Sequence, residues 1–425
     1  MSGKTALNNT PDPLNVKHTY KDFYKQSVED ASFLWLLRSI VMEQPHYYAR
    51  DIHTLEQRIE TRLDGLMTAL DPGWEACEEA LEFQEPGEVF TAMIIAMRSH
   101  ETGKIKTAVD IGLENALATP GLISAMGWLP DELANPWTER FLNGKEMAHK
   151  YLGLATCSVR RQNPGERLTN ILQRDDCRQH EKLYSRALRL IGELRRQDCM
   201  PAINQAMHDD NENIRFWAIW SAVLLGHPTS AHHLQDFVFK TGPYQNQAIQ
   251  LAFRALPISQ ARGWIDKLAE DKNQTRAVIK ATSALGDPHA INWLINTMQD
   301  PTLAKLAGES FTLITGIDIA AHQSVLDAPN NIIAIDDTDN NAIDLDDDEN
   351  LPTPDAEKIA SIWCQQSPHY IIGHRYFMGQ PIGAKHLKEI LTDGTQRQRH
   401  AAAMELALSE SDMPLPNTRA RMLTP

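Results

Sequence analysis

The sequence predicts an all-α fold, a solenoid of stacked antiparallel helix pairs, and two observations support this prediction. A short apolar run that closes on Gly or Pro recurs through the middle of the chain, with the closing residues Gly192, Gly226, Pro257, Gly286 and Gly316. These residues are 34, 31, 29 and 30 positions apart, a spacing typical of repeated short helix pairs. Each of the first four runs is followed by apolar residues at helical spacing. A single pair cannot bury its apolar face alone, so neighbouring pairs must stack.

Glycines mark the expected helix ends within these regular repeats, which span residues 181–320. Gly192, Gly226 and Gly286 are expected just past the end of a helix, where the left-handed backbone conformation favours Gly. Pro228 and Pro288 follow two of these glycines within two residues. Because Pro suits the first position of a helix, each of them would begin the second helix of its pair.

The chain before the regular repeats is expected to be helical but less regular. Residues 1–19 are polar and contain two prolines, so they are interpreted as a flexible tail. Residues 20–180 form the expected N-terminal helical region, and an amphipathic pattern over 54–63 supports helices there. The later part, 74–180, is interpreted as degenerate repeats of the same array. A separate N-terminal helical domain is the alternative.

The repeat pattern breaks after Gly316. Residues 328–354 are rich in Asp and Asn and are interrupted by prolines, a composition that buries too little apolar surface to fold alone. This segment is expected to be an acidic loop. Helical patterns return over 355–425, with Pro354 and Asp355 as start signals, which predicts a C-terminal helical extension.

Part of the acidic loop resembles a calcium-binding loop. Asp337, Asp339, Asn341 and Asp348 fit positions of a calcium-loop count, but the position that requires Gly is Ala342. Asp348 occupies the position at which a calcium loop requires a bidentate Glu. A solvated acidic loop or a partner-binding segment is therefore favoured over a calcium site.

Composition and charge argue against several classes of protein. The net charge of −15 argues against a nucleic-acid partner, which requires a basic face. No run of 18 uncharged apolar residues and no signal peptide is found, so no membrane span is expected. Five scattered cysteines do not suggest a disulfide framework. These features favour a cytoplasmic protein with reduced thiols.

The sequence contains none of the common motifs of catalytic or nucleotide-binding sites. No phosphate loop, dinucleotide fingerprint, nucleophile elbow or zinc-protease helix is found. His232 and His233 are adjacent and would point about 100° apart on a helix, and Cys177 with His180 lacks a second pair at zinc spacing. We therefore predict no catalytic residue, no metal and no cofactor. An enzyme whose Asp, Glu and His residues converge from separate repeats is the open alternative.

Two groups of residues are candidates for binding a protein partner. Trp217 and Trp220, beside Arg215, lie three apart on one expected helix, as either solenoid core or an aromatic ridge on the surface. The basic cluster Arg186, Arg189, Arg195 and Arg196 is interpreted as a solvated helix face rather than a phosphate site. The predicted partner-binding residues are Arg215, Trp217, Trp220, Asp344, Asp346, Asp347, Asp348 and Glu349.

Short motifs along the chain resemble those of a known family. They include 33–38 (FLWLLR), 63–66 (LDGL), 77–81 (CEEAL), 87–90 (GEVF), 125–130 (AMGWLP), 215–220 (RFWAIW), 348–352 (DENLP) and 396–399 (QRQR). The chain resembles, from about residue 25 to 410, an uncharacterised family of proteobacterial proteins with HEAT-like repeats. The genes of that family are often found near type VI secretion components such as spike, tip and adaptor proteins.

The resemblance implies a context rather than a site, because the family has no established catalytic residues. It implies a HEAT-like α-solenoid that handles a secreted toxin or its delivery machinery in the cytoplasm. The leading hypothesis is a non-enzymatic scaffold, an immunity protein that binds and neutralises a type VI secretion effector. The alternative is an adaptor or chaperone that loads an effector onto the secretion spike. The acidic balance of the chain fits a basic protein partner.

Overall fold

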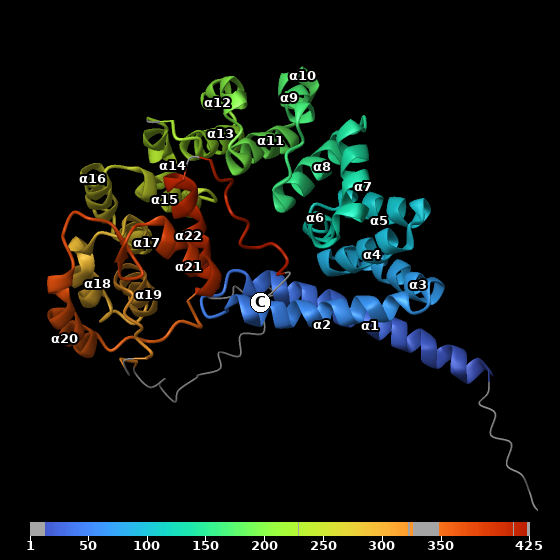
Figure 1. The fold of residues 1–425 in the computed structure, drawn as a ribbon, viewed down its shortest axis with the longest axis horizontal. Helices are drawn as coiled ribbons and strands as arrows, with labels where there is room; N and C mark the ends of the chain where they lie inside the picture. The colour runs from blue at the N-terminus through green and yellow to red at the C-terminus, as the bar shows by residue number, and fades with distance from the viewer. Residues whose placement is uncertain (1–12, 228, 322–323, 326–347, 411, 423–425) are drawn as a thin grey trace, which may run out of the picture. The chain divides into compact units, whose positions relative to one another are not determined.

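The computed structural model describes residues 13–227, 229–321, 324–325, 348–410 and 412–422 (Figure 1). Over these residues the chain forms the helices α1 to α22, several short 3₁₀ turns and one small antiparallel hairpin. The predicted all-α class is therefore confirmed. Helix α1 (Pro13–Val41) begins inside the range 1–19 that was expected to be a tail.

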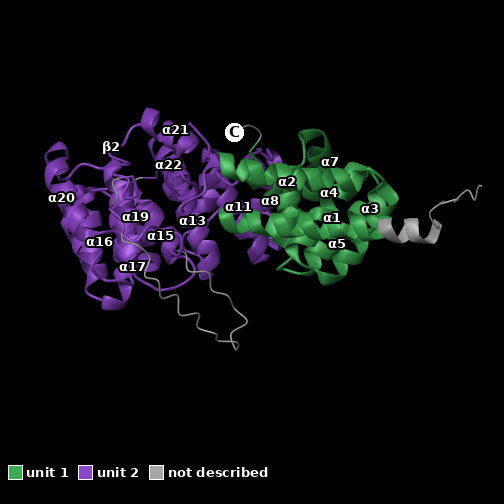
Figure 2. Cartoon of the chain, turned by 90° about the horizontal axis from the view of Figure 1, so that it is seen from below, with its two compact units in different colours: residues 1–41, 50–159, 420–425 green, residues 42–49, 160–419 purple. Residues whose placement is uncertain are grey.

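The chain divides into two compact units (Figure 2). Unit 1 contains residues 1–41, 50–159 and 420–425, and unit 2 contains residues 42–49 and 160–419. The ends of the chain thus both belong to unit 1, although unit 2 supplies most of the sequence between them. The division after residue 159 lies earlier than residue 180, where the irregular N-terminal region was expected to end.

Unit 1 is built around one helix that is buried on all sides, α4. Its helices are α1, α2 (Ala49–Met67), α3 (Leu70–Ala80), α4 (Pro86–Ser99), α5 (Thr102–Glu114), α6 (Thr119–Trp128), α7 (Asp131–Asn143) and α8 (Met147–Arg160). Residues 89–97 of α4 are all buried, and α1, α3, α5 and α6 pack against this helix. A helix that is apolar on every face requires such neighbours. The ring of Phe90 lies 5.6 Å from that of Trp35 and 5.4 Å from that of Trp128.

Unit 2 begins with the stacked helix pairs. Its helices up to the acidic loop are α9 (Glu166–Gln173), α10 (Asp175–Arg178), α11 (Glu181–Leu194), α12 (Met200–Ala206), α13 (Glu212–Leu224), α14 (Gln235–Val238), α15 (Gln245–Ala255), α16 (Ile258–Ala269), α17 (Thr275–Leu285), α18 (Ile291–Thr297) and α19 (Ala304–Thr315). The first helices of successive pairs, α11, α13, α15, α17 and α19, pack against one another in order. The predicted stack of antiparallel pairs is confirmed.

The glycines that close the repeats have two different roles. Gly226 and Gly286 have φ angles of +80° and +71°, which confirms the left-handed ends expected there, and Gly316 has a φ angle of +66°. Gly192 was expected to have the same role, and this prediction is wrong because it lies inside α11. A Cβ there would lie 2.5 Å from Oγ of Ser221, so its missing side chain lets α11 and α13 approach closely. The helix ends beyond it, where Arg195 adopts a φ of 56°.

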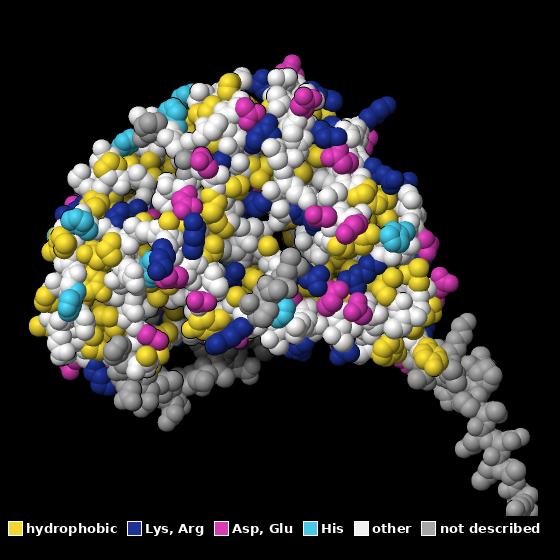
Figure 3. All heavy atoms as spheres, viewed as in Figure 1, with side chains coloured by type: hydrophobic (Ala, Val, Ile, Leu, Met, Phe, Trp, Pro, Cys, Tyr) yellow, Lys and Arg dark blue, Asp and Glu magenta, His cyan; other side chains and the backbone are white. Residues whose placement is uncertain are grey.

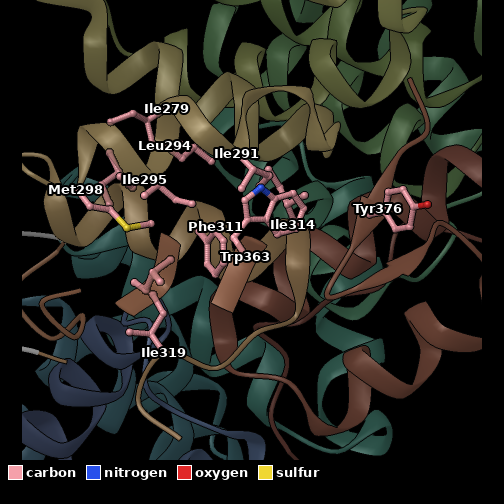
Figure 4. Close-up of a cluster of buried hydrophobic side chains, with 13 residues drawn as sticks. Ile279, Ile291, Leu294, Ile295, Met298, Phe311, Ile314, Ile319, Trp363 and Tyr376 are labelled. Carbon is pink, nitrogen blue, oxygen red and sulfur yellow. The ribbon is translucent and has the colours of Figure 1, made fainter. Parts of the chain in front are cut away.

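The C-terminal extension is part of the unit 2 core. It consists of α20 (Ala356–Gln366), the hairpin of β1 (Tyr376–Phe377) and β2 (Gln380–Pro381), α21 (Ala384–Asp393) and α22 (Gln396–Ser409). Asp355 caps α20 by accepting a hydrogen bond from the amide of Lys358 at 3.1 Å, as the start signal predicted. Trp363 of α20 lies among buried side chains of α18 and α19, and its ring is 6.2 Å from that of Phe311 (Figure 4).

The surface shows mixed charge and no membrane-spanning element among the described residues. On the face drawn in Figure 3, Lys and Arg side chains are interspersed with Asp and Glu side chains. None of the described helices combines the length and the apolar character that crossing a bilayer requires.

Candidate functional site

The candidate surface lies on two adjacent helices of the repeat stack, α11 and α13. Its defining contact is between Arg189 of α11 and Trp217 of α13, where the guanidinium carbon is 4.4 Å from the centre of the indole ring. Nε of Arg189 also donates to Oε1 of Glu193 at 2.9 Å, one turn further along α11. Trp217 is half-buried, so part of this residue remains accessible. We call Arg189 and Trp217 the Arg–Trp patch.

Arg215, which was predicted to bind a partner together with the tryptophans, holds a loop in place. Its guanidinium donates hydrogen bonds to the carbonyl oxygens of Asp209 at 2.7 Å and Asp210 at 3.2 Å. It also lies 5.7 Å from the centre of the Phe237 ring. The α13 N-terminus that carries Arg215 is fixed by Asn211, whose side chain accepts hydrogen bonds from two backbone amides. Arg215 and Trp217 are two positions apart on α13, so their side chains point to different sides of the helix, and Arg215 lies outside the contact between Arg189 and Trp217.

Trp220 lies beneath the surface. Only 5% of this residue is exposed, and its ring contacts that of Trp217 edge-on, with the centroids 5.4 Å apart. Of the two tryptophans predicted to bind a partner, Trp217 is thus the accessible one. Trp220 can contribute to binding through the support that it gives to Trp217.

The acidic residues divide between described and undescribed parts of the chain. Asp344, Asp346 and Asp347 lie outside the described residues. Asp348 is 5% exposed, forms an ion pair with Arg276, and lies 3.8 Å from Nη1 of Arg397. The expectation of a solvated loop is therefore wrong at Asp348, because a buried carboxylate requires partners of opposite charge. Glu349 has an exposed side chain, and its carbonyl oxygen accepts a hydrogen bond from Lys305 at 2.7 Å.

The basic cluster on α11 is engaged with the rest of unit 2, which corrects its interpretation as a solvated face. Glu193 is 1% exposed, and its carboxylate lies 2.9 Å from Arg189, 3.5 Å from Arg161 and 4.0 Å from Arg186. Burial lowers the pKa of Arg161, and the charge of Glu193 opposes that shift. Arg195 donates a hydrogen bond to the carbonyl oxygen of Ala407.

The stacking of Arg189 on Trp217 was not predicted, and no local pattern in the sequence indicates it. Gly192 of α11 meets Ser221 of α13, which is 29 positions later (221 − 192 = 29). The same offset from Arg189 leads to residue 218, next to Trp217. Because residue 218 points about 100° away from Trp217 on α13, this offset does not pair the two side chains.

Two buried thiols and one capping histidine have structural surroundings. Burial raises the pKa of Cys77, and burial together with Asp198 raises that of Cys199 to about 11, so neither is a ready thiolate near pH 7. His180 caps α11 by accepting from the amide of Leu183 at 3.2 Å. In the described part of the chain, no three His, Cys, Asp or Glu side chains gather in a way that could hold a metal ion.

Comparison with known proteins identifies the repeat type. Residues 165–253 match the family model of HEAT repeats. This range runs from just before α9 into α15 and includes the whole Arg–Trp patch. A comparison with curated proteins gives no match. Stacked repeats of this type present extended surfaces that typically bind other proteins. The chain therefore carries HEAT-like repeats in an all-α solenoid, and its candidate binding surface lies on the matched helices.

Proposed function

We propose that this chain is a non-enzymatic protein-binding scaffold, and that it acts in the cytoplasm as an immunity protein that binds and neutralises a type VI secretion effector. The observation that carries the binding role is the Arg–Trp patch on the HEAT-like repeats. Trp and Arg are the residue types that dominate the energetics of protein interfaces. A half-buried ring beneath a guanidinium gives a partner both apolar area and positive charge.

The preformed geometry of the Arg–Trp patch also supports binding. Nε of Arg189 donates to the buried Glu193 while its guanidinium lies over Trp217. Side chains that are already ordered lose little conformational entropy when a partner binds, so more of the contact energy appears as affinity.

The choice of an immunity role rests on the family resemblance and on the demands of each role. An inhibitor needs one stable surface that matches its toxin. An adaptor must also release its cargo. The net charge of −15 would favour encounter with a basic toxin domain.

The experiment that tests this role begins with affinity capture of the tagged full-length chain from its native cells. A captured candidate effector is then expressed alone and together with this chain. We expect growth arrest in the first case and rescue in the second. If this chain instead travels with the effector to the secretion spike and gives no rescue, the adaptor role replaces the immunity role.

The binding surface is tested with a matched pair of tryptophan variants. Trp217→Ala should weaken binding of the captured effector by about tenfold or more, the loss typical of an interface hot spot. Trp293→Ala on α18 removes a ring that is 38% exposed, and we expect unchanged affinity. Thermal unfolding must show that both variants remain folded. Equal affinities for the two variants would place the interface away from the Arg–Trp patch.

A further inference from the structure

The last described residues of the chain, 420–422, lie in unit 1 as a strap against α2. Side chains of unit 1 hold the main chain of this strap. The amide of Met422 donates to Oε2 of Glu56 at 2.7 Å, and its carbonyl oxygen lies 3.1 Å from Nδ1 of His53. The carbonyl oxygen of Ala420 accepts a hydrogen bond from Arg38 at 3.3 Å. Contacts to the main chain do not depend on the side chains of the strap, so other peptides could make them.

One side chain of the strap is recognised specifically, that of Arg421. Its guanidinium carbon lies 4.6 Å from the centre of the Trp128 ring, and Nη2 lies 3.1 Å from Oε2 of Glu60. The indole nitrogen of Trp128 donates to the same Glu60 oxygen at 2.9 Å. An aromatic face together with a carboxylate is a combination that selects arginine.

The recognition groups are pre-positioned by burial. Glu56 is 2% exposed and Arg38 is 6% exposed, and Nε of Arg38 donates to Oε1 of Glu56 at 2.7 Å. Burial alone would raise the pKa of Glu60, but the hydrogen bond from Trp128 and the charges of Arg98 and Arg421 lower it below the usual value. Glu60 therefore stays ionised near neutral pH, ready to accept a cation.

Space remains beside the strap. A groove of about 380 Å³ is lined by the strap residues Arg421 and Met422 and by side chains of α2, among them the carboxylates Glu56, Glu60 and Asp64. We call this feature the α2 groove. Glu56 pairs with Arg38, and Arg98 pairs with Asp64 and with Oε1 of Glu60. Oε2 of Glu60, which Arg421 contacts, is therefore the oxygen that would receive the arginine of a peptide.

We propose that the α2 groove is a binding site for an arginine-bearing peptide segment of a partner protein, and that residues 420–422 occupy it in cis. The strap is the final part of the described chain, so it can leave without unwinding a helix. It competes with any incoming peptide as a tethered ligand. The apparent affinity for a partner peptide is therefore reduced by the fraction of molecules in which the groove is open.

The test uses the full-length chain and a labelled peptide that copies residues 417–422, with blocked ends, in a fluorescence polarisation assay. Arg421→Ala in the full-length chain should release its own strap and bind this peptide about tenfold more tightly than the natural chain does. Arg419→Ala is the matched control. Arg419 is an exposed arginine two positions earlier, and it pairs with Glu43 in unit 2. We expect it to bind like the natural chain.

Two further variants examine recognition of the arginine. A peptide with Ala in place of its second Arg should bind Arg421→Ala at least about tenfold more weakly than the parent peptide. Adding Glu60→Gln to Arg421→Ala should also weaken binding of the parent peptide. Circular dichroism establishes that each protein is folded. Equal binding of both peptides, or no gain from Arg421→Ala in a folded protein, would overturn the proposal.

Hydrogen exchange in the natural chain tests the proposal without any substitution. Hydrogen exchange at the amide of Met422 should be slow because that amide donates to Glu56. Adding the unlabelled peptide in excess should accelerate its exchange as the strap is displaced. An exchange rate that stays unchanged at saturating peptide, or protection that appears only in a dimer with exchanged straps, would contradict binding in cis.

Discussion

At the residue scale, unit 2 depends on a buried cation that is paired across two elements. Arg254 of α15 is 7% exposed, and its Nε lies 3.2 Å from Oε1 of Glu405 on α22. Arg375 pairs with the same carboxylate and also donates to the carbonyl oxygen of Arg254 at 2.9 Å. Burial lowers the pKa of Arg254 to about 10, the direction expected when a charge loses its hydration.

We predict that Glu405→Gln lowers the free energy of unfolding by about 3 kcal/mol or more, because it leaves two guanidiniums beside a neutral amide. The matched control is Glu410→Gln near the same helix end, where Glu410 forms a more exposed pair with Lys388 at 3.0 Å. That change should cost less than about 1 kcal/mol. Urea unfolding of both variants gives the comparison. Similar losses for the two would mean that Glu405 does not stabilise the buried arginine.

A buried histidine, His400, makes the free energy of unfolding depend on pH. His400 lies in unit 2 with Nε2 2.9 Å from the carbonyl oxygen of Met42, and burial, helped by the charge of Arg419, lowers its pKa from 6.5 to about 4. Between these two values the unfolded chain binds a proton that the folded chain does not. The contribution of His400 is therefore complete above pH 6.5 and is lost as the pH falls toward 4.

The loss attributable to His400 should be on the order of 3 kcal/mol across that window. Because carboxylates also titrate there, the quantity to measure is the difference in unfolding free energy between the natural chain and His400→Gln at each pH. We expect this difference to shrink as the pH falls. A difference that is constant from pH 7 to 4 would show that His400 is not the group responsible.

At the element scale, the repeat glycines serve as docking points for the hairpin of β1 and β2. The amide of Tyr376 donates to the carbonyl oxygen of Gly286 at 2.8 Å, and the amide of Gly379 donates to that of Ile314 at 3.1 Å. A Cβ at Gly286 would lie 2.4 Å from the carbonyl oxygen of Tyr376, and one at Gly316 would lie 2.5 Å from that of Met378. Glycine is thus needed at these positions both for the backbone angle and for the contact.

This double requirement predicts unequal effects of alanine at equivalent repeat positions. Gly226→Ala should cost about 1 kcal/mol, because φ is +80° but nothing lies within 4 Å of the new Cβ. Gly286→Ala should cost at least about 1 kcal/mol more, since the hairpin must move and a hydrogen bond is lost. Chemical denaturation measures the difference, and hydrogen exchange at Tyr376 reports the hairpin. Equal costs with a protected Tyr376 amide would contradict this role of Gly286.

At the scale of the whole molecule, net charge is the property most relevant to a partner. The chain carries −15 at neutral pH, and its charged side chains are interspersed on the face drawn in Figure 3. Long-range attraction to a basic partner is screened by salt, whereas packing against Trp217 is not. Varying the ionic strength therefore separates the electrostatic attraction from the packing against Trp217.

For the partner identified by capture and rescue, we predict that the association rate falls as salt rises while the dissociation rate changes little. Surface plasmon resonance between about 50 mM and 500 mM NaCl measures both rates. The association rates of the natural chain and of the Trp217→Ala variant should depend on salt concentration in the same way. Their dissociation rates should differ. An association rate that is independent of salt would remove electrostatic steering from the proposed mechanism.

The sequence by itself determined the all-α class, the stacked pairs and the left-handed ends at Gly226 and Gly286. These features follow from patterns that extend over one or two turns of helix and recur about every 30 residues, so they can be recognised without knowledge of contacts. The start of α20 at Asp355 is equally local, because a cap bonds within its own first turn.

Only the tertiary structure decided which side of each helix is covered. Gly192 was expected at a helix end but lies within a helix–helix contact. Asp348 is buried against Arg276 and Arg397, which lie 72 and 49 positions away in the sequence (348 − 276 and 397 − 348). The strap contact between Met422 and Glu56 joins residues 366 positions apart. No local pattern encodes such pairings, because they depend on which distant surfaces the folded chain brings together.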